Sequence, residues 1–298
     1  MKNLHDISVI GVDLGGTKIL AGKVTADRVV KQFKELVPKQ GTQDQVIEAL
    51  CNAIDQVFDS HIAGIGIGVP SVVDVEKGIV YDVQNIPSWK EVHLKEILES
   101  KYGVPVYLNN DANCFAIGEK YFGKGKQYEN FVALIVGTGM AAGLIINGKL
   151  FNGANCGAGE FGTIPYLEHN FEFYTSGQFF TNVYQVKGED IFRLAQQGDQ
   201  DALKMFDEFG SHFGNAIKTI LYAVDPEVII LGGSVSQTFP FFEKSMRKGL
   251  TSFAYQKTIT KLKFDISTNP DIAVLGAAAL PLEALNIQKT LAVNSLRS

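Results

Sequence analysis

The sequence predicts an α/β protein built from two similar halves, each a mixed β-sheet flanked by helices. Near the start of the chain, three segments rich in β-branched residues follow one another across tight turns. A similar run begins near residue 131. Each run continues into alternating helical and strand-like segments, the pattern of mixed sheets covered by helices. We therefore expect an internal duplication.

The first half opens with an antiparallel meander, because Gly or Asp residues occupy the gaps between its strands. The expected strands are 7–13, 17–24 and 28–36. A helix over 42–60 follows, since Val46, Leu50 and Ile54 recur at helical spacing. Residues 63–69 return to strand.

The second half repeats this order. A strand over 131–136 leads into a glycine-rich turn, and Asn147-Gly148 is a hairpin signal before a short strand at 150–151. The remaining elements are expected as strand 143–146, helix 200–224, strand 227–231, helix 239–250, strand 262–266 and helix 272–280.

The expected domain boundary lies near 111–125, where a strand over 104–109 gives way to a helix and a Gly-Lys-Gly loop. We assign 1–112 to a small N-terminal domain and 113–281 to a larger C-terminal domain. A C-terminal helix over 282–298 is a candidate to complete the first domain. A cleft between two such domains would favour ligand binding, because both walls can contribute polar groups.

Charge and composition point to small-molecule partners. The formal net charge of -5 and pI near 5.6 disfavour a nucleic-acid-binding surface, which concentrates Lys and Arg. The first segment, 1–7, lacks the apolar core of a secretory signal, and no apolar run approaches the roughly 20 residues of a membrane span. Cys51, Cys114 and Cys156 are few and widely spaced, which favours packing roles in a reducing, cytoplasmic location.

The sharpest local signal is the turn Asp13-Leu14-Gly15-Gly16-Thr17-Lys18, placed between two expected strands. Gly15 and Gly16 let the backbone turn with its amides exposed to an anion, and Thr17 and Lys18 add a hydroxyl and a cation. Asp13 could hold a magnesium ion through water, because hard cations prefer carboxylate oxygen. An ordinary Gly-Gly hairpin is the alternative.

Two later glycine segments strengthen the phosphate interpretation. Gly137-Thr138-Gly139 occupies the equivalent place in the second meander, so two turns could donate backbone N–H groups to one polyphosphate. Gly232-Gly233 ends an apolar strand, where an adenine or ribose could lie flat against the backbone. A structural bulge at the first segment and a plain glycine turn at the second are the alternatives.

Together with Gly66-Ile67-Gly68-Val69-Pro70, Asn110-Asp111-Ala112-Asn113 and Gly159-Glu160-Phe161-Gly162, these motifs resemble the ROK family, named for repressors, open reading frames and kinases. The resemblance covers nearly the whole chain. It implies a two-domain actin-like ATPase fold, a duplicated ribonuclease H-like architecture with an interdomain active-site cleft. It also implies ATP and magnesium as cofactors, and glucokinase-like phosphorylation of a hexose or hexose derivative at its 6-hydroxyl.

The resemblance assigns Asp111 as the general base that takes the proton of the sugar hydroxyl. Its place between an apolar strand and a helix would hold the carboxylate rigidly. Helix capping is the alternative role for an Asp at such a position. Asn110 would then hydrogen-bond sugar hydroxyls.

The other sugar-binding residues also follow from the resemblance. Glu160 matches a sugar-contacting glutamate and Glu172 a second one, with Glu168 as its rival. Carboxylates suit this role because they accept hydrogen bonds from hydroxyl groups. Asn85 and Trp89 belong to a segment that similar kinases place beside the sugar, although Trp89 could equally be a core residue.

One departure from the family pattern concerns zinc. Members commonly carry a His after the Gly-Glu-x-Gly segment and three Cys shortly beyond it, but this chain has Thr163 at the His position and no Cys in 165–171. Tetrahedral N/S coordination cannot be assembled from these residues, so no zinc is expected. Thr163 also changes the expected sugar pocket, which leaves the sugar open.

Several alternatives remain at this point. The chain could phosphorylate an N-acetylhexosamine such as N-acetylmannosamine, or be a non-catalytic sugar-binding or regulatory family member. A repressor would need an added helix-turn-helix, for which the strand starting near Ile7 leaves no room. By analogy with similar proteins, a homodimer is one expected assembly.

Overall fold

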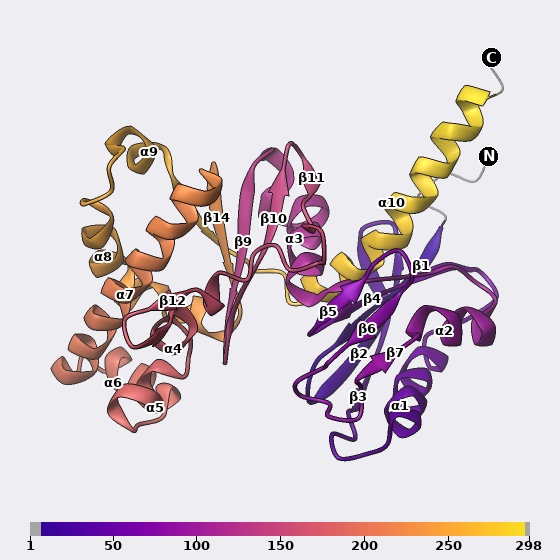
Figure 1. Ribbon diagram of the computed structural model, residues 1–298, viewed down its shortest axis with the longest axis horizontal. Coiled ribbons are helices and arrows are strands. Elements are labelled where there is room, and N and C mark those ends of the chain that lie inside the picture. The colour runs from indigo at the N-terminus through magenta and orange to yellow at the C-terminus, as the bar shows by residue number, and fades with distance from the viewer. Residues whose placement is uncertain (1–6, 296–298) are drawn as a thin grey trace. The chain divides into compact units, whose positions relative to one another are not determined.

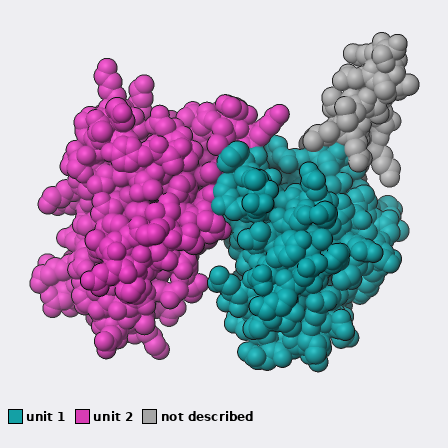
Figure 2. All heavy atoms as spheres, in the orientation of Figure 1, with its two compact units in different colours: residues 1–126, 150–158, 268–298 teal, residues 127–149, 159–267 magenta. Residues whose placement is uncertain are grey.

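The computed structural model describes residues 7–295, and the contacts among them divide the chain into two compact units (Figures 1 and 2). Unit 1 comprises residues 1–126, 150–158 and 268–298, and unit 2 comprises 127–149 and 159–267. The expectations for residues 1–6, and for the last three residues of the C-terminal helix, lie outside the described residues. No helix within 7–295 combines the length and apolar content that crossing a bilayer requires.

The sheet of unit 1 has the strand order β3-β2-β1-β4-β8. The predicted antiparallel meander is confirmed by β1 (Ser8–Leu14), β2 (Lys18–Thr25) and β3 (Arg28–Leu36). Next to β1, the strands β4 (Ile62–Val69) and β8 (Val106–Asn110) run parallel to it. The carboxyl ends of β1, β4 and β8 therefore meet at one edge, where open α/β sheets bind ligands.

Successive side chains of β1 point to opposite faces of the sheet, and each face is covered by helices. Ile10, Val12 and Leu14 join the core beneath α1 (Gln43–Asp55) and α2 (Leu94–Tyr102). Val9 packs on the opposite face, against α10 (Ile272–Ser295), and α3 (Asp111–Phe122) packs on α10. Asp13 has the parity of Val9 and so belongs to the face covered by α3 and α10.

Helix α1 begins where the sequence predicts and ends earlier. Thr42 and Gln45 form a capping box at its start, each side chain accepting from the backbone N–H of the other residue. The helix stops at Asp55 instead of continuing to residue 60, because Val57 and Phe58 both turn back to the Ile54 carbonyl.

A small three-stranded sheet follows β4, formed by β5 (Val72–Asp74), β6 (Ile79–Tyr81) and β7 (Glu91–Val92). The loop from Val83 to Trp89 is closed by a main-chain hydrogen bond, in which the Val83 N–H donates to the Trp89 carbonyl at 3.0 Å. Trp89 is fully buried in the core of unit 1. The core alternative for Trp89 is therefore the one that the structure shows.

The sheet of unit 2 has the order β11-β10-β9-β14-β15. β9 (Phe131–Val136) pairs antiparallel with β10 (Met140–Ile146), whose other neighbour is β11 (Lys149–Leu150), and parallel with β14 (Val228–Gly232). β14 in turn pairs parallel with β15 (Lys263–Ile266). The topology repeats that of unit 1 strand for strand, which confirms the predicted duplication.

The helices of unit 2 pack around a cluster of aromatic rings. α7 (Gln200–Val224) and α8 (Phe239–Leu250) pack on each other through Phe209, Phe213 and Phe242, with centroid separations of 5.0–5.8 Å. The other elements are short. They are β12 (Pro165–Tyr166), β13 (His169–Asn170), α4 (Phe171–Thr175), α5 (Phe179–Tyr184), α6 (Gly188–Gln196), α9 (Gln256–Lys261), η2 (Lys124–Gln127), η3 (Phe161–Thr163) and η4 (Ser234–Thr238).

The expected break between helices at 280 and 282 is absent, because α10 runs through Pro281. Proline cannot donate to the carbonyl four residues earlier, which here belongs to Ala277. This carbonyl instead lies against Gly66 of β4, where a side-chain carbon added to Gly66 would come within 1.8 Å of the Ala277 oxygen. The pyrrolidine ring packs over Gly64 and Gly66, so two glycines of the strand make room for the kink-prone turn.

The domain division also differs from the expected boundary after residue 112. Residues 113–126 belong to unit 1, because α3 packs against α10. The segments 150–158 and 268–281 also belong to unit 1. Each unit is made of several separate stretches of the chain, so no single boundary position divides them.

Candidate functional site

The carboxyl edge of the unit 1 sheet collects the acidic and amide groups singled out in the sequence. In the strand register, Asp13 of β1 lies opposite Gly68 of β4, and Gly68 lies opposite Asn109 of β8. Asp111 follows at the first position of α3, with its Cα 3.6 Å from where a side-chain carbon on Gly68 would stand. The structure thus brings Asp13, Asn110 and Asp111 to one edge of unit 1.

The cap of α3 is Asn110, not Asp111. Asn110 has extended backbone dihedrals and its Oδ1 accepts hydrogen bonds from the N–H groups of Ala112 and Asn113, at 2.9 and 3.4 Å. Its Nδ2 donates to the Ser71 carbonyl at 3.3 Å. Asn110 therefore has the helix-capping role that was the alternative for Asp111. Sugar binding by Asn110 stays a prediction that can use only the remaining Nδ2 hydrogen.

Asp111 and Asp13 act on a common neighbour, the buried thiol of Cys114. Burial raises the pKa of Cys114 well above its ordinary value, and the negative charges of Asp111 and Asp13 raise it further. Burial also raises the pKa of Asp13, which the positive charge of Lys18 partly offsets. The two carboxylates therefore both act on the Cys114 thiol, and a cation near Asp13 stabilises the ionised form of its carboxylate.

The first glycine turn connects β1 to β2 and lies beside Asn85. The Gly15 N–H donates to the Lys18 carbonyl at 2.9 Å, and the side chains of Thr17 and Lys18 are exposed. Asn85 packs so closely over Gly16 that a side-chain carbon there would come within 2.6 Å of the Asn85 Cβ. The structure therefore joins the predicted phosphate turn to the segment predicted for the sugar.

A buried network of amides behind Asp111 was missed in the sequence. Asn113 donates through Nδ2 to the Asn109 Oδ1 at 2.9 Å and to the Asn152 Oδ1 at 3.3 Å, and Asn109 donates to Asn152 at 3.1 Å. The Cys156 thiol donates to the Asn109 Oδ1 at 3.1 Å. These bonds anchor the 150–158 segment to α3, and the four-residue spacing of Asn109 and Asn113 was the available signal.

In the second glycine turn, in unit 2, two carbonyls accept hydrogen bonds from the 177–178 segment. The Gly177 N–H donates to the Gly137 carbonyl at 2.7 Å, and the Gln178 Nε2 donates to the Thr138 carbonyl at 2.5 Å. In a trans peptide the carbonyl and the following N–H point in opposite directions. The N–H groups of Thr138 and Gly139 therefore face away from the Gly177–Gln178 segment, as donors to an anion would.

Glu172 and Glu160 lie at the same end of unit 2. The Met140 N–H donates to a Glu172 carboxylate oxygen at 2.9 Å, and that oxygen lies 2.6 Å from where a side-chain carbon on Gly139 would stand. Desolvation raises the pKa of Glu160, and the negative charge of Glu172 raises it further. The Thr163 hydroxyl donates to the Glu160 carbonyl at 2.8 Å, which fixes the turn that carries Glu160.

A cavity of about 670 Å³ opens beside the second glycine turn, within the range of cofactor sites. Phe180, Phe192 and Phe206 supply apolar walls, and Lys187 and Glu189 supply charges. Ser234 and Val235 line it directly after the predicted Gly232-Gly233 pair. The residues from α5 and α6 were missed in the sequence, because only the fold brings these short elements to the turn.

Within the described part of the chain, no group of three or more His, Cys, Asp or Glu side chains is arranged to hold a metal ion. His169 stacks on Phe173, with ring centroids 3.8 Å apart. A magnesium ion bound to phosphates needs fewer protein ligands, and the carboxylate of Asp13 fits that use. Zinc independence stays a prediction.

Known proteins are similar to this chain over most of its length. The chain is 28% identical over 318 residues to the glucokinase of Thermotoga maritima, covering 94% of this chain and 98% of that protein. It is 31% identical to the N-acetyl-D-glucosamine kinase of Shigella boydii, over 77% and 84% of the two chains. The structure of a ROK family glucokinase from Streptomyces griseus with glucose and AMPPNP matches with a TM-score of 0.77 and 29% identity, covering 92% and 98%.

This chain has the two-domain actin-like fold of the solved ROK sugar kinase structures. The ROK family model matches residues 9–284, which include both glycine turns, Asp111 and the Glu160 segment. The chain therefore belongs to the ROK family.

Proposed function

We propose that this protein is an ATP-dependent sugar kinase that phosphorylates a hexose or hexose derivative at its 6-hydroxyl, with Asp111 as general base. The observation that carries the proposal is the grouping of Asp111 and Asp13 at the carboxyl edge of the unit 1 sheet, beside a glycine turn. The sugar kinases among its relatives supply the reaction class.

In the proposed reaction the sugar hydroxyl oxygen attacks the γ-phosphorus of ATP while the bond to the β–γ bridging oxygen breaks and ADP leaves. Asp111 takes the hydroxyl proton, and its place in the first turn of α3 limits its motion. Positioning and charge stabilisation supply most of the catalysis in such transfers.

Nucleotide binding is proposed for the glycine turns and the unit 2 cavity. The N–H groups of Gly16, Thr138 and Gly139 would donate to phosphate oxygens, with Lys18 adding a positive charge. The aromatic walls of the cavity suit a purine, and Ser234 lies beside the predicted Gly232-Gly233 contact. The AMPPNP complex of the Streptomyces griseus relative supports ATP as the donor.

Sugar binding is proposed for Asn85, Asn110, Glu160 and Glu172. An ionised carboxylate accepts hydrogen bonds from vicinal hydroxyls, and two carboxylates close enough to raise one pKa can address one sugar ring. The N-acetyl-D-glucosamine kinase relative supports amino sugars as the alternative substrates.

The pH dependence of sugar phosphorylation should reveal the pair of glutamates. Glu160 must be ionised to accept a hydroxyl, and its raised pKa moves the acid limb of kcat/KM to higher pH. Replacing Glu172 by Gln removes the neighbouring charge, lowers the pKa of Glu160 and should shift this limb to lower pH. Glu168→Gln, on the exposed hairpin, is the control. An unshifted limb in Glu172→Gln would contradict the pairing.

Magnesium would be held by ATP and, through water, by Asp13, where the ion would neutralise charge on the phosphates. We expect dialysis against EDTA to abolish activity and added magnesium to restore it fully, with an unchanged melting temperature. The reason is that Thr163 and the Cys-free 165–171 segment provide no tetrahedral zinc ligands. Elemental analysis that finds one tightly bound zinc per chain would overturn this expectation.

A coupled ADP-release assay tests the proposed function. The panel comprises glucose, mannose, fructose, allose, glucosamine, N-acetylglucosamine and N-acetylmannosamine, each with magnesium ATP. Sugar-dependent ADP release with at least one of them is the expected result. If every sugar leaves the ADP rate at its background while ATP still binds, the chain is a binding protein or regulator.

A further inference from the structure

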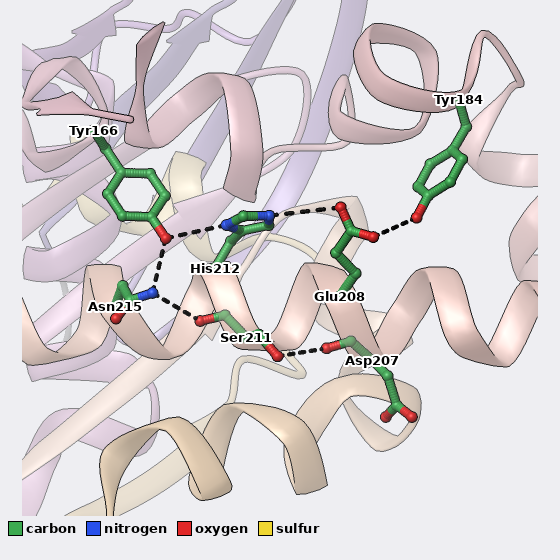
Figure 3. A network of polar contacts seen from close by, with 7 residues as sticks. All are labelled: Tyr166, Tyr184, Asp207, Glu208, Ser211, His212 and Asn215. Carbon is green, nitrogen blue, oxygen red and sulfur yellow. Dashed lines mark hydrogen bonds and ion pairs between the residues drawn. The ribbon is translucent and has the colours of Figure 1, made fainter. Parts of the chain in front are cut away.

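A polar network joins the long helix α7 to the β12–β13 hairpin (Figure 3). The Tyr166 hydroxyl lies 3.1 Å from the His212 Nδ1, and the Asn215 Nδ2 donates to the same hydroxyl at 2.7 Å. On the far side of His212, its Nε2 lies 3.8 Å from a carboxylate oxygen of Glu208. The hydroxyl of Tyr184 donates to the other Glu208 oxygen at 2.6 Å.

One direction in this network follows from the groups present. An Asn Nδ2 only donates, so the Tyr166 oxygen accepts from Asn215 and its own hydrogen is available to the His212 Nδ1. Donation to Nδ1 corresponds to the neutral tautomer with its hydrogen on Nε2, on the side of Glu208. Burial lowers the pKa of His212, opposed by the charge of Glu208, and this agrees with a neutral ring.

Tyr166 connects this network to α4. Its ring stacks on Phe171, with centroids 4.5 Å apart and an interplanar angle of 17°. It also meets Tyr174 edge-on at 5.5 Å. A helix of five residues is not stable alone, so its orientation must come from such packing and from Asn170, whose Oδ1 accepts from the Phe173 N–H at 2.9 Å.

Helix α4 in turn carries the group that touches the second glycine turn. Glu172 accepts from the Met140 N–H, and the next loop ties Gly177 to the Gly137 carbonyl. A displaced α4 would therefore also displace the Glu172 carboxylate. Small displacements of substrate-binding groups cost binding and rate steeply.

We propose that Tyr166 and His212 are positioning residues of the sugar site, because their hydroxyl–imidazole bond fixes the hairpin on α7 and thereby orients α4 and Glu172. The proposal rests on the sugar kinase function proposed above. Neither residue is among the proposed sugar-binding or ATP-binding residues, so their expected effect is on the placement of Glu172.

Four variants test the proposal. Tyr166→Phe keeps the ring that stacks on Phe171 and removes only the hydroxyl. His212→Leu removes the acceptor at Nδ1, whereas His212→Asn keeps an acceptor at that place and should rescue it. Tyr184→Phe is the matched control, because it removes the same kind of hydroxyl from the other Glu208 oxygen and leaves the Tyr166–His212 contact in place.

We expect Tyr166→Phe and His212→Leu to raise the KM for the best sugar of the panel about tenfold, the effect of about one lost hydrogen bond. The KM for ATP should change less than the KM for the sugar, because most of the cavity lining comes from α5, α6 and η4. His212→Asn and Tyr184→Phe should stay near the wild-type KM. An unchanged sugar KM in both Tyr166→Phe and His212→Leu would overturn the proposal, whatever their melting temperatures.

Amide hydrogen exchange separates this proposal from the proposed function. Exchange at 171–176 should accelerate in Tyr166→Phe and His212→Leu but not in Tyr184→Phe, whether or not the wild-type chain phosphorylates a sugar. Unchanged exchange there in the two variants would overturn the positioning role. A wild-type chain that is inactive on the whole panel would refute only the kinase function.

Discussion

Replacing Asp111 by Ala is expected to lower sugar-dependent ADP formation at least about a hundredfold, the lower range for loss of a general base. The carboxylate is the group proposed to accept the hydroxyl proton, and no neighbouring side chain is proposed to replace it. The ADP-release assay at saturating ATP and sugar measures the effect directly.

Asp111→Asn is the sharper form of this test. An Asn side chain can still accept from the Ala112 N–H, as the Asp111 Oδ1 does at 2.8 Å, so the first turn of α3 should keep its shape. The amide cannot take a proton at neutral pH. We expect the melting temperature and the affinity for ATP to stay near wild type, and near-normal turnover in this variant would remove Asp111 from the mechanism.

Gly66→Ala is expected to destabilise unit 1 strongly, because the structure leaves no room for a side-chain carbon at this position. The added carbon would come within 1.8 Å of the Ala277 carbonyl oxygen and 2.8 Å of the Pro281 Cδ. Both atoms belong to α10, which packs on β4, so the clash can be relieved only if the helix shifts as a whole. We expect unfolding free energy to fall by about 3 kcal/mol, the upper range for overpacking, as measured by urea denaturation.

The matched control is Gly249→Ala in α8, where the new carbon would make only ordinary contacts of 3.7 and 3.8 Å. Alanine is the better helix former by about 1 kcal/mol, so this variant should be neutral or more stable. Equal stabilities for Gly66→Ala and the wild-type chain would show that α10 does not approach β4 as closely as described.

The elements that the sequence predicts best are long and carry their own signals. Helix α7 has the expected bounds because its apolar residues repeat along its whole length and Asp199 caps its start, accepting from the N–H groups of Asp201 and Ala202. The two meanders follow from β-branched runs and their turns. The hairpin β12–β13 and α4 gave no such signal, because two to five residues are too few to show a period.

Pro281 shows a different limit. A proline in a helical pattern normally predicts a break, and the sequence alone cannot show that Gly64 and Gly66 accept its ring. The helix continues with the proline ring packed over these two glycines of β4. Packing of α3 on α10 likewise joins distant segments, and it places residues 113–126 in unit 1.

In the site, the sequence identifies the residue types and the fold decides among their roles. Asn110 and Asp111 are both good helix caps, and only the extended backbone of Asn110 assigns the cap to it. The Asn109–Asn113–Asn152 network and the walls of the unit 2 cavity join residues far apart in the chain. No local pattern could have predicted those groupings.

Transfer of the γ-phosphoryl group of ATP to a sugar hydroxyl can be followed by incubating the protein with [γ-³²P]ATP, magnesium and the best sugar of the panel, then separating labelled sugar phosphate from inorganic phosphate. We expect the label almost entirely in the sugar, at a rate that collapses in Asp111→Asn. Label that appears only in inorganic phosphate, at a rate independent of the sugar, would rule out the proposed sugar kinase function.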